Sequence, residues 1–181
     1  MITIVPYDSR WPREFAAEAA RIRDALGPLA VRIDHVGSTA VPGLAAKAVI
    51  DIQVSVVSLS PRGWLVPRML ELGYFHLDLG GFDLVYPYFR RPEAWPHSHH
   101  VHACESGGEQ ERRHLVFRDY LRRHPQRAAE YAALKRQLAT LHPGRDHDER
   151  ERYSIAKSSF VEAAIEAADA EGLPPSDPSG G

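Results

Sequence analysis

The feature that most constrains the fold is a nearly continuous apolar segment at residues 48–57, AVIDIQVSVV. Its length and its many β-branched residues predict a central strand that is covered on both faces. One acidic residue, Asp51, interrupts this segment between Ile50 and Ile52. A carboxylate is costly in a hydrophobic strand unless it is paired or bound to a metal. Asp51 is therefore the first candidate functional residue.

The rest of the chain predicts one small α+β fold. Phe15, Ala19, Ile22 and Leu26 follow a helical spacing that Gly27 ends. We expect further strands at residues 31–35, 82–91 and 99–105, a helix at 60–72, and three helices from residue 109 onward, the last capped by Asp146 or Asp148. This order predicts a small mixed β-sheet with helices packed on one side and a C-terminal helical segment.

Composition narrows the class of protein. The 181 residues predict a single domain at 1–171 and a flexible tail at 172–181. The 22 basic and 24 acidic residues argue against a nucleic-acid partner. No apolar run approaches the roughly 20 residues that cross a bilayer, and the start lacks the pattern of a signal peptide. We expect a cytoplasmic enzyme or binding domain with no membrane partner, and the oligomeric state is open.

A turn of small residues precedes the central strand. Gly37, Ser38 and Thr39 follow the strand predicted at residues 31–35. A strand that leads into such a turn offers backbone N–H groups and a hydroxyl to a phosphate. Asp51 on the neighbouring strand would hold the Mg²⁺ that accompanies this phosphate. The spacing of these residues alone favours an ordinary turn beside an acidic edge residue over a phosphate site.

Histidines gather in the strand predicted at residues 99–105. His100 and His102 share one face, roughly 7 Å apart at Cα. Such a pair can bind a transition metal, contact a phosphate or relay protons. A metal hydrolase centred on this pair is one hypothesis, whereas His97 and His99 fit a solvated strand end.

The run DHVGSTAVPGLAAKAVIDI at residues 34–52 resembles the signature of the GrpB family. The resemblance continues through residues 99–102, 113–121, 131–135 and 153–160, so it covers almost the whole chain except the tail. The family belongs to the nucleotidyltransferase superfamily, whose members share the palm fold of DNA polymerase β. The resemblance therefore implies that fold here.

The resemblance also implies roles for residues. Gly37 and Ser38 correspond to the pair that grips the terminal phosphates of a nucleotide, and Asp51 to the first of two acids that bind the catalytic Mg²⁺, or Mn²⁺ in its place. The second acid would fall at position 53, where this chain has Gln53. Either another acid completes the metal site, with Glu105 and Asp83 as candidates, or the ordinary two-metal reaction is lost.

Further candidates complete the predicted site. Thr39 and Lys47 would help to bind the nucleotide, although Lys47 also fits a surface lysine. Lys157 shares a helix face with Tyr153 and would neutralise charge on the triphosphate, although a surface lysine fits the same pattern. His100 or His102 would position or deprotonate the acceptor.

Two functions follow from these assignments. The first is the binding of a nucleoside triphosphate (NTP) with Mg²⁺, and transfer of a nucleotidyl group to a small-molecule acceptor. The alternative is a non-catalytic protein that binds a nucleotide or a phosphometabolite and has lost the second acid, because Gln53 stands in its place.

Overall fold

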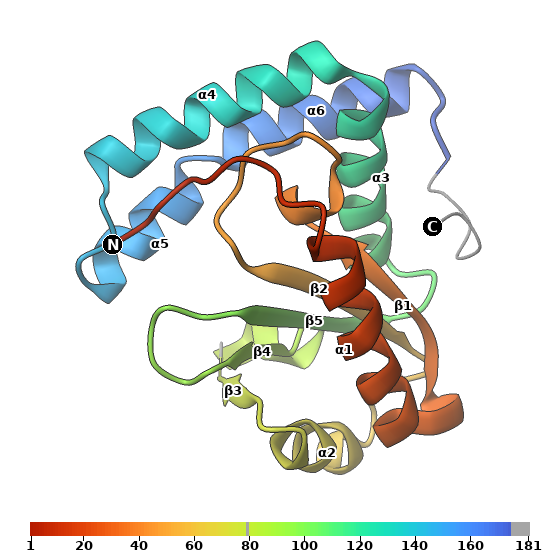
Figure 1. Ribbon diagram of the computed structural model, residues 1–181. Helices are drawn as coiled ribbons and strands as arrows, with labels where there is room; N and C mark the ends of the chain where they lie inside the picture. Colours follow the sequence, from red (N-terminus) through yellow and green to blue (C-terminus); the bar gives the residue numbers. More distant parts are fainter. Residues whose placement is uncertain (79, 175–181) are drawn as a thin grey trace.

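The computed structural model describes residues 1–78 and 80–174, without the side chains of Arg62 and Phe82. Figure 1 shows a small mixed sheet between two groups of helices. The elements in chain order are α1 (Trp11–Leu26), η1 (Gly27–Leu29), β1 (Ala30–Val36), η2 (Ser38–Ala40), β2 (Ile50–Val56), η3 (Arg62–Trp64), α2 (Leu65–Glu71), β3 (Phe75–Leu77), η4 (Gly80–Leu84), β4 (Tyr88–Arg91), β5 (His99–Glu105), α3 (Glu109–Arg123), α4 (Pro125–Leu141), α5 (His147–Ile155) and α6 (Ser158–Ala170), where η marks a 3₁₀ helix. This is the α+β class that the sequence predicts.

The sheet is mixed and has β2 near its centre. Its strand order is β1-β2-β5-β4-β3. β2 runs parallel to β5 and antiparallel to β1, and β4 is antiparallel to both β5 and β3. The apolar segment at 48–57 therefore forms an inner strand, as its composition predicts.

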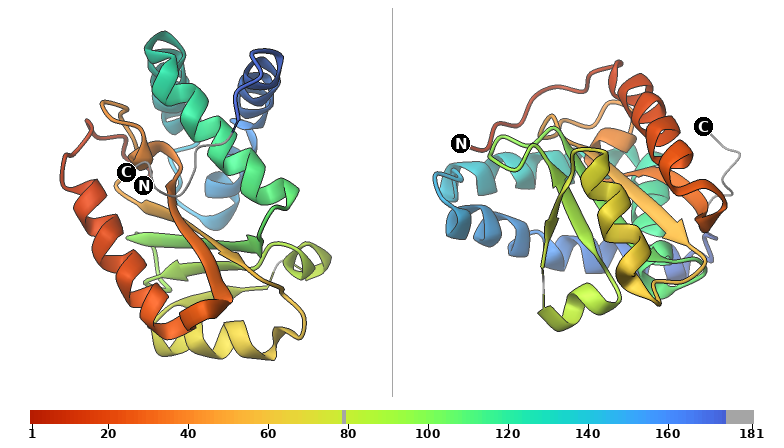
Figure 2. Two further views of the ribbon diagram at one scale, coloured as in Figure 1. Left: turned by 90° about the vertical axis from the view of Figure 1, so that its right-hand side faces the viewer. Right: turned by 90° about the horizontal axis from the view of Figure 1, so that it is seen from below.

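One face of this sheet is apolar. Every second residue of β2 (Ile50, Ile52, Val54 and Val56) is buried in a core that includes Ile22 of α1 and Met69 of α2. Figure 2 shows α1 and α2 on this side and the C-terminal helices on the other. The expectation of helices on one side plus a C-terminal helical segment is confirmed.

The opposite face of the sheet is polar. Asp51 and Gln53 of β2 lie level with His100 and His102 of β5 in the parallel register. Since side chains alternate along a strand, these four side chains leave the sheet on the same face. The fold thus brings together the two strand segments that the sequence singles out.

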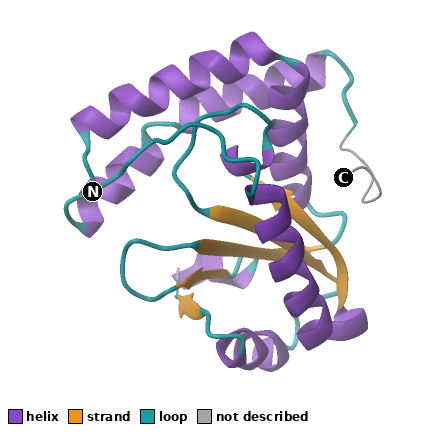
Figure 3. Cartoon of the chain, viewed as in Figure 1, coloured by secondary structure: helices purple, strands orange, loops and turns teal. Residues whose placement is uncertain are grey.

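The C-terminal helices have a core of their own. Phe117 of α3, Tyr131 of α4 and Ile165 of α6 are buried together with Val41 and Leu44. The last two belong to the loop between η2 and β2, which Figure 3 shows reaching from the sheet to the helices. This packing fixes α3–α6 beside the polar face.

Some predicted elements have different bounds. Only Tyr88–Arg91 of the predicted 82–91 strand is extended, because Gly80–Leu84 forms a 3₁₀ helix that begins at a glycine with φ +63°. The sequence does not predict the edge strand Phe75–Leu77, since three residues give no alternation signal. The helix predicted at 60–72 spans only Leu65–Glu71.

The end of the chain differs in one further respect. The last predicted helix is two helices, α5 and α6, which meet at Ala156–Lys157. Asp146 caps α5, as one of the two predicted alternatives states, and its side chain accepts a hydrogen bond from the Glu149 N–H at 2.8 Å. The single domain at 1–171 stays a prediction, and residues 175–181 of the predicted flexible tail lie outside the described residues. None of the helices in the described chain combines the length and the apolarity needed to cross a bilayer.

Candidate functional site

A cavity of about 580 Å³ lies between the polar face of the sheet and helices α4–α6. It gathers most of the residues that the sequence singles out. Those that line it are Gly37, Ser38, Thr39, Lys47, Asp51, His100, His102 and Lys157. Glu105 does not line it, nor does Asp83.

Asp51 lies in this cavity between two histidines. Its Oδ1 is 3.1 Å from Nδ1 of His100 and 3.6 Å from Nε2 of His102. Burial raises the pKa of Asp51, but the hydrogen bonds and charge of the two histidines outweigh this effect and hold the pKa well below 3.8. The carboxylate therefore stays ionised at neutral pH.

Gly37 brings the backbone unusually close to this carboxylate. Its φ of +68° and ψ of −168° lie in a region that is essentially restricted to glycine. A Cβ added at Gly37 would lie 2.5 Å from Oδ2 of Asp51. No other residue type fits, so the sequence places glycine here for both conformation and space.

The rest of the predicted turn is held from two directions. The Ser38 hydroxyl accepts a hydrogen bond from Lys135 Nζ at 2.9 Å. The Thr39 hydroxyl donates to the Val49 carbonyl and lies 3.0 Å from Nε2 of His35. Thr39 thus fastens the turn to the segment before β2, while Ser38 is part of a polar cluster in the cavity.

Hydrogen bonds extend from Asp51 in both directions along the polar face. On one side, Nε2 of His100 lies 2.9 Å from Nδ1 of His97. On the other, the Tyr86 hydroxyl bridges Nδ1 of His102 at 2.8 Å and Nε2 of His114 at 2.7 Å. His97 is therefore part of the site rather than a solvated strand end, which corrects the sequence-based interpretation.

Gln53 is the last residue of this chain of hydrogen bonds. It is fully buried, and its Oε1 lies 2.8 Å from Nδ1 of His114 in α3. Its amide nitrogen has no hydrogen-bond partner within the described part of the chain. The second acid position of the superfamily is therefore occupied by an amide that is bonded to a helix and does not line the cavity.

The two acids proposed to replace it lie elsewhere. Glu105 is five residues beyond His100 on β5, which is about 16 Å along a strand, and its carboxylate bonds to the Ser58 hydroxyl and the Leu59 N–H. Asp83 pairs with His76, which is level with the core residue Phe89 and so lies on the apolar side of the sheet. The assignment of Glu105 as a metal ligand is therefore wrong, because distance separates it from Asp51.

Lysines define the electrostatics of the cavity. The sequence has only three lysines, Lys47, Lys135 and Lys157, and all three line this cavity. They come from the loop before β2, from α4 and from the junction of α5 and α6. With Arg90 and Arg150 they make five cationic side chains against two carboxylates, Asp51 and Glu151.

The protonated form of each of these lysines is destabilised in the cavity. Burial, followed by repulsion from the other lysines, lowers the pKa of Lys135 to about 7 and that of Lys157 to about 8. Burial also lowers the pKa of Lys47. Clustered buried cations with too few counter-charges are stabilised by an anion, and a polyphosphate supplies several charges at once.

Tyr153 organises two of these lysines. Its ring lies 5.3 Å from Lys47 Nζ and 4.8 Å from Lys157 Nζ, within the range of cation–π attraction. Its hydroxyl is fully buried and has no hydrogen-bond partner among the described residues. Tyr153 therefore contributes the face of its ring to the lysine cluster.

The carboxylate of Asp51 is better suited to Mg²⁺ than to a transition metal. Mg²⁺ is commonly held by one or two carboxylates together with the phosphates of its substrate. Asp51 suits this role, since it is ionised and faces the lysine cluster. A transition-metal centre on His100 and His102 fits less well. The ring nitrogens that point away from Asp51 are already hydrogen-bonded, in His100 to His97 and in His102 to Tyr86. In the described chain, the group of three potential ligands that lie within 4.8 Å of one another is His147, Asp148 and Glu151, which are exposed.

The sequence did not single out several residues of this site. Lys135, Tyr86, His114 and Tyr153 contribute to it, and Lys135 is only 3% exposed. A signal was present for Lys135. It lies four residues after Tyr131, on one helix face, in a chain that otherwise uses arginine for almost all its basic positions.

The lysines also make anion binding dependent on pH. Below pH 7 Lys135 is charged, and as the pH rises toward 9 it loses its proton unless a phosphate retains it. We expect tripolyphosphate to bind more weakly at pH 9 than at pH 7, with proton uptake on binding at pH 8. Titration calorimetry in buffers of different ionisation enthalpy measures both effects.

Two variants test whether Lys135 is the group that takes up the proton when tripolyphosphate binds. Lys135→Met should reduce the proton uptake, while Arg136→Met, which removes an exposed cation from the next position, should leave it unchanged. Proton release on binding, or equal uptake in wild type and Lys135→Met, would contradict the assignment.

The chain is thus a small α+β protein whose fold is of the nucleotidyltransferase-like type and whose cavity is cationic. Comparison with known proteins is more specific. The model of the family described as GrpB protein matches residues 1–167. The chain therefore belongs to the GrpB family.

Individual relatives agree with this assignment. The UPF0157 protein YqkA of Bacillus subtilis is 36% identical over 167 residues, which are 92% of this chain and 47% of YqkA, so the chain spans about half of that relative. The crystal structure of conserved protein GrpB from Enterococcus faecalis superposes with a TM-score of 0.80 at 33% identity and covers 94% of this chain and 99% of that one. A dephospho-CoA kinase of Mycolicibacterium paratuberculosis is 35% identical over 158 residues, 75% of this chain and 39% of the kinase.

Proposed function

We propose that this chain binds an NTP with Mg²⁺ or Mn²⁺ and transfers a nucleotidyl group to a small-molecule acceptor in the cytoplasm. One observation carries the proposal. Every lysine of the chain converges with the Gly37–Ser38 turn on a single ionised carboxylate, Asp51, in one cavity. A relative of which the match covers 39% has the name dephospho-CoA kinase, and a phosphate-binding role for this chain is compatible with that name.

The residues divide the task between them. Lys135 and Lys157, with Lys47 and the Ser38 hydroxyl, bind the phosphates and neutralise the charge that develops on the leaving diphosphate. Asp51 holds the metal ion, which polarises the phosphate oxygens when bound. Because only two carboxylates of the described chain line the cavity, it has few ligands for metal ions. The lysines are therefore the main source of positive charge beside the phosphates.

The proposed reaction needs a base near Asp51. An acceptor hydroxyl or amine attacks the α-phosphorus, the bond from that phosphorus to the diphosphate breaks, and the acceptor proton passes to an imidazole nitrogen. Burial lowers the pKa of His100 despite its contact with Asp51, so His100 is neutral at pH 7. Its Nε2 accepts the proton once the acceptor takes the place of His97 at this nitrogen. His102 lies on the other side of the same carboxylate and is the second candidate.

A non-catalytic nucleotide or phosphometabolite binder is the second candidate function, and the environment of Gln53 favours it. Because the Gln53 amide is buried against His114, the second metal ligand of the superfamily is lost. Such a protein would use the same lysines and the same turn to bind phosphates without turning them over.

Turnover distinguishes the two functions. Purified protein is incubated with each NTP, Mg²⁺ or Mn²⁺ and pooled hydroxyl and amine acceptors, and diphosphate release is measured. The nucleotidyltransferase releases diphosphate in an acceptor-dependent way, and Asp51→Asn abolishes the release. Tight NTP binding without release in any pool would favour the binder. A gain of metal-dependent turnover in Gln53→Glu would then identify a degenerate active site.

A further inference from the structure

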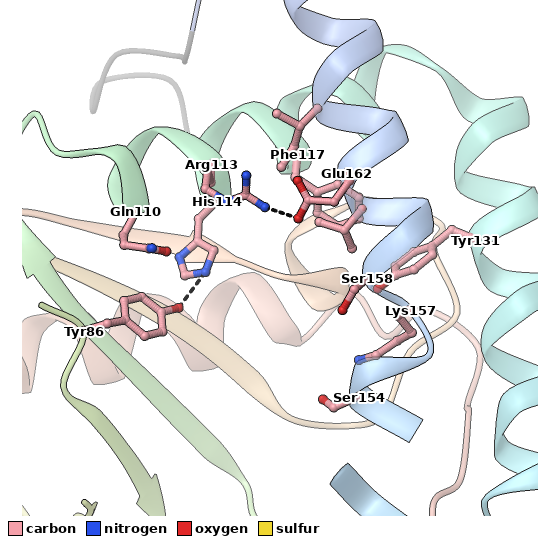
Figure 4. A pocket seen from close by; sticks show the side chains of 12 residues that line it. Tyr86, Gln110, Arg113, His114, Phe117, Tyr131, Ser154, Lys157, Ser158 and Glu162 are labelled. Carbon is pink, nitrogen blue, oxygen red and sulfur yellow. Dashed lines mark hydrogen bonds and ion pairs between the residues drawn. The ribbon is translucent and has the colours of Figure 1, made fainter. Parts of the chain in front are cut away.

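A second, smaller cavity of about 280 Å³ adjoins the first between α3 and α6. Figure 4 shows its walls, with Tyr86, His114 and Gln110 on one side and Ser154, Lys157 and Ser158 on the other. The two cavities have several lining residues in common, among them His114, Phe117, Tyr131 and Lys157. A ligand with its phosphates at the lysines can therefore extend past Lys157 into the smaller space.

The chemistry of the smaller cavity differs from that of the larger one. Phe117, Val161 and Ile165 provide an apolar surface, and Gln110 and Ser158 provide neutral polar groups. The guanidinium of Arg113 pairs with the carboxylate of Glu162, so these two charges compensate each other (Figure 4).

The imidazole in the wall of this cavity is also neutral. Burial lowers the pKa of His114 to about 3. Among the residues that line this cavity, Lys157 at the boundary with the larger cavity is thus the cation without a paired carboxylate.

We infer that this smaller cavity holds the base of the nucleotide whose phosphates occupy the lysine cluster. A nucleobase is neutral and planar, with apolar faces and a hydrogen-bonding edge. Phe117 and Val161 suit its faces. The carboxamide of Gln110, which makes no hydrogen bond to any described residue, offers one donor and one acceptor to its edge.

A charged acceptor molecule suits this space less well. The pair of Arg113 and Glu162 would have to open to provide a counter-charge for it. The larger cavity has room for the acceptor near His97, Tyr88 and Arg90, on the side of Asp51 that carries the neutral His100. This division of the two cavities rests on the proposed function.

The test fills the smaller cavity without touching the larger one. Ser158 lies in the first turn of α6, is exposed and lines only the smaller cavity, so Ser158→Trp would occupy that space. Ser159→Trp is the matched control, because Ser159 is the next residue, is also exposed and lines neither cavity. The dissociation constants of each NTP and of inorganic tripolyphosphate, both with Mg²⁺, are measured by titration calorimetry.

In wild type, at least one NTP should bind more tightly than tripolyphosphate. Ser158→Trp should weaken that NTP by tenfold or more, to the level of tripolyphosphate, and leave tripolyphosphate unchanged. Ser159→Trp should change neither.

Three results would overturn the inference. Unchanged NTP affinity in Ser158→Trp would exclude the base from this cavity, and unchanged affinity with lost turnover would place the acceptor there instead. Wild-type protein that binds tripolyphosphate as tightly as every NTP would show that no base subsite exists. By contrast, wild-type protein that binds neither ligand would contradict the proposed function itself, and the inference with it.

Discussion

Replacing Gly37 by alanine should destabilise the protein and remove its phosphate-binding turn in one step. The backbone at Gly37 has φ +68° and ψ −168°, and a non-glycine residue in this region costs about 1–3 kcal/mol. The new Cβ would also lie 2.5 Å from Oδ2 of Asp51 and force the carboxylate aside. We expect the midpoint of thermal unfolding to fall by roughly 4–10 °C, with loss of NTP binding.

Gly43 provides a matched control for this prediction. Its φ is also positive, at +79°, but a Cβ there meets nothing within 4 Å. Gly43→Ala therefore measures the conformational cost alone, which is about 1 kcal/mol, and should retain binding. If both variants lose the same stability and both still bind NTP, the contact between Gly37 and Asp51 has no functional role.

The second large effect is expected at Asp51. Asp51→Asn keeps the shape of the side chain but removes the charge that would hold the metal ion. We expect Mg²⁺-dependent NTP binding to weaken about 100-fold, equivalent to roughly 2.8 kcal/mol. Metal-free tripolyphosphate should still bind, because the lysines remain. Calorimetric titrations with and without Mg²⁺ separate the two contributions.

Glu151 is the control for this variant, because it is the other carboxylate that lines the cavity. Glu151→Gln should keep the metal dependence of wild type. If the NTP affinity of Asp51→Asn still rises with Mg²⁺ as in wild type, the metal ion binds elsewhere. A large loss of Mg²⁺-dependent affinity in Glu151→Gln would assign the metal to Glu151 instead.

The sequence predicts the framework of the site well, because its signals are local. A carboxylate inside an apolar segment identifies Asp51, and the two-residue spacing of His100 and His102 puts both on one face of a strand. The parallel register of β2 and β5 then brings these signals together. The glycine before Ser38 also has a local cause, since its conformation requires the absence of a side chain.

What the sequence could not predict depends on tertiary packing. The register of β2 against β5 is one example, since it places His100 level with Asp51 and Glu105 level with Val56. The bond between Gln53 and His114 joins residues 61 positions apart. Lys135 lies in a helix whose neighbouring apolar residues favour a core face, and only the packing of α4 against the turn shows that its ammonium reaches Ser38.

Lys157 shows the same limit. Its helical neighbours fit a surface lysine and a phosphate ligand equally well, whereas in the structure the helix stops at Ala156–Lys157 and the side chain lines the cavity. The sequence has no glycine or proline at the junction of α5 and α6, so it gives no signal for the break between these helices.

The central claim is that the lysine cluster binds the phosphates of a nucleotide. Its most direct test is thermal unfolding against a panel of NTPs with Mg²⁺, on wild type and on the double variant Lys135→Met, Lys157→Met. The variant should fold, because it removes one buried and one half-buried charge and keeps the length of both side chains. At a hundred times the dissociation constant, an NTP should stabilise wild type by about 2.7 kcal/mol, a shift of roughly 5–10 °C, and the same concentration should shift the variant by less than about 2 °C. Equal shifts in the two proteins, or no shift of wild type with any NTP, would contradict the account.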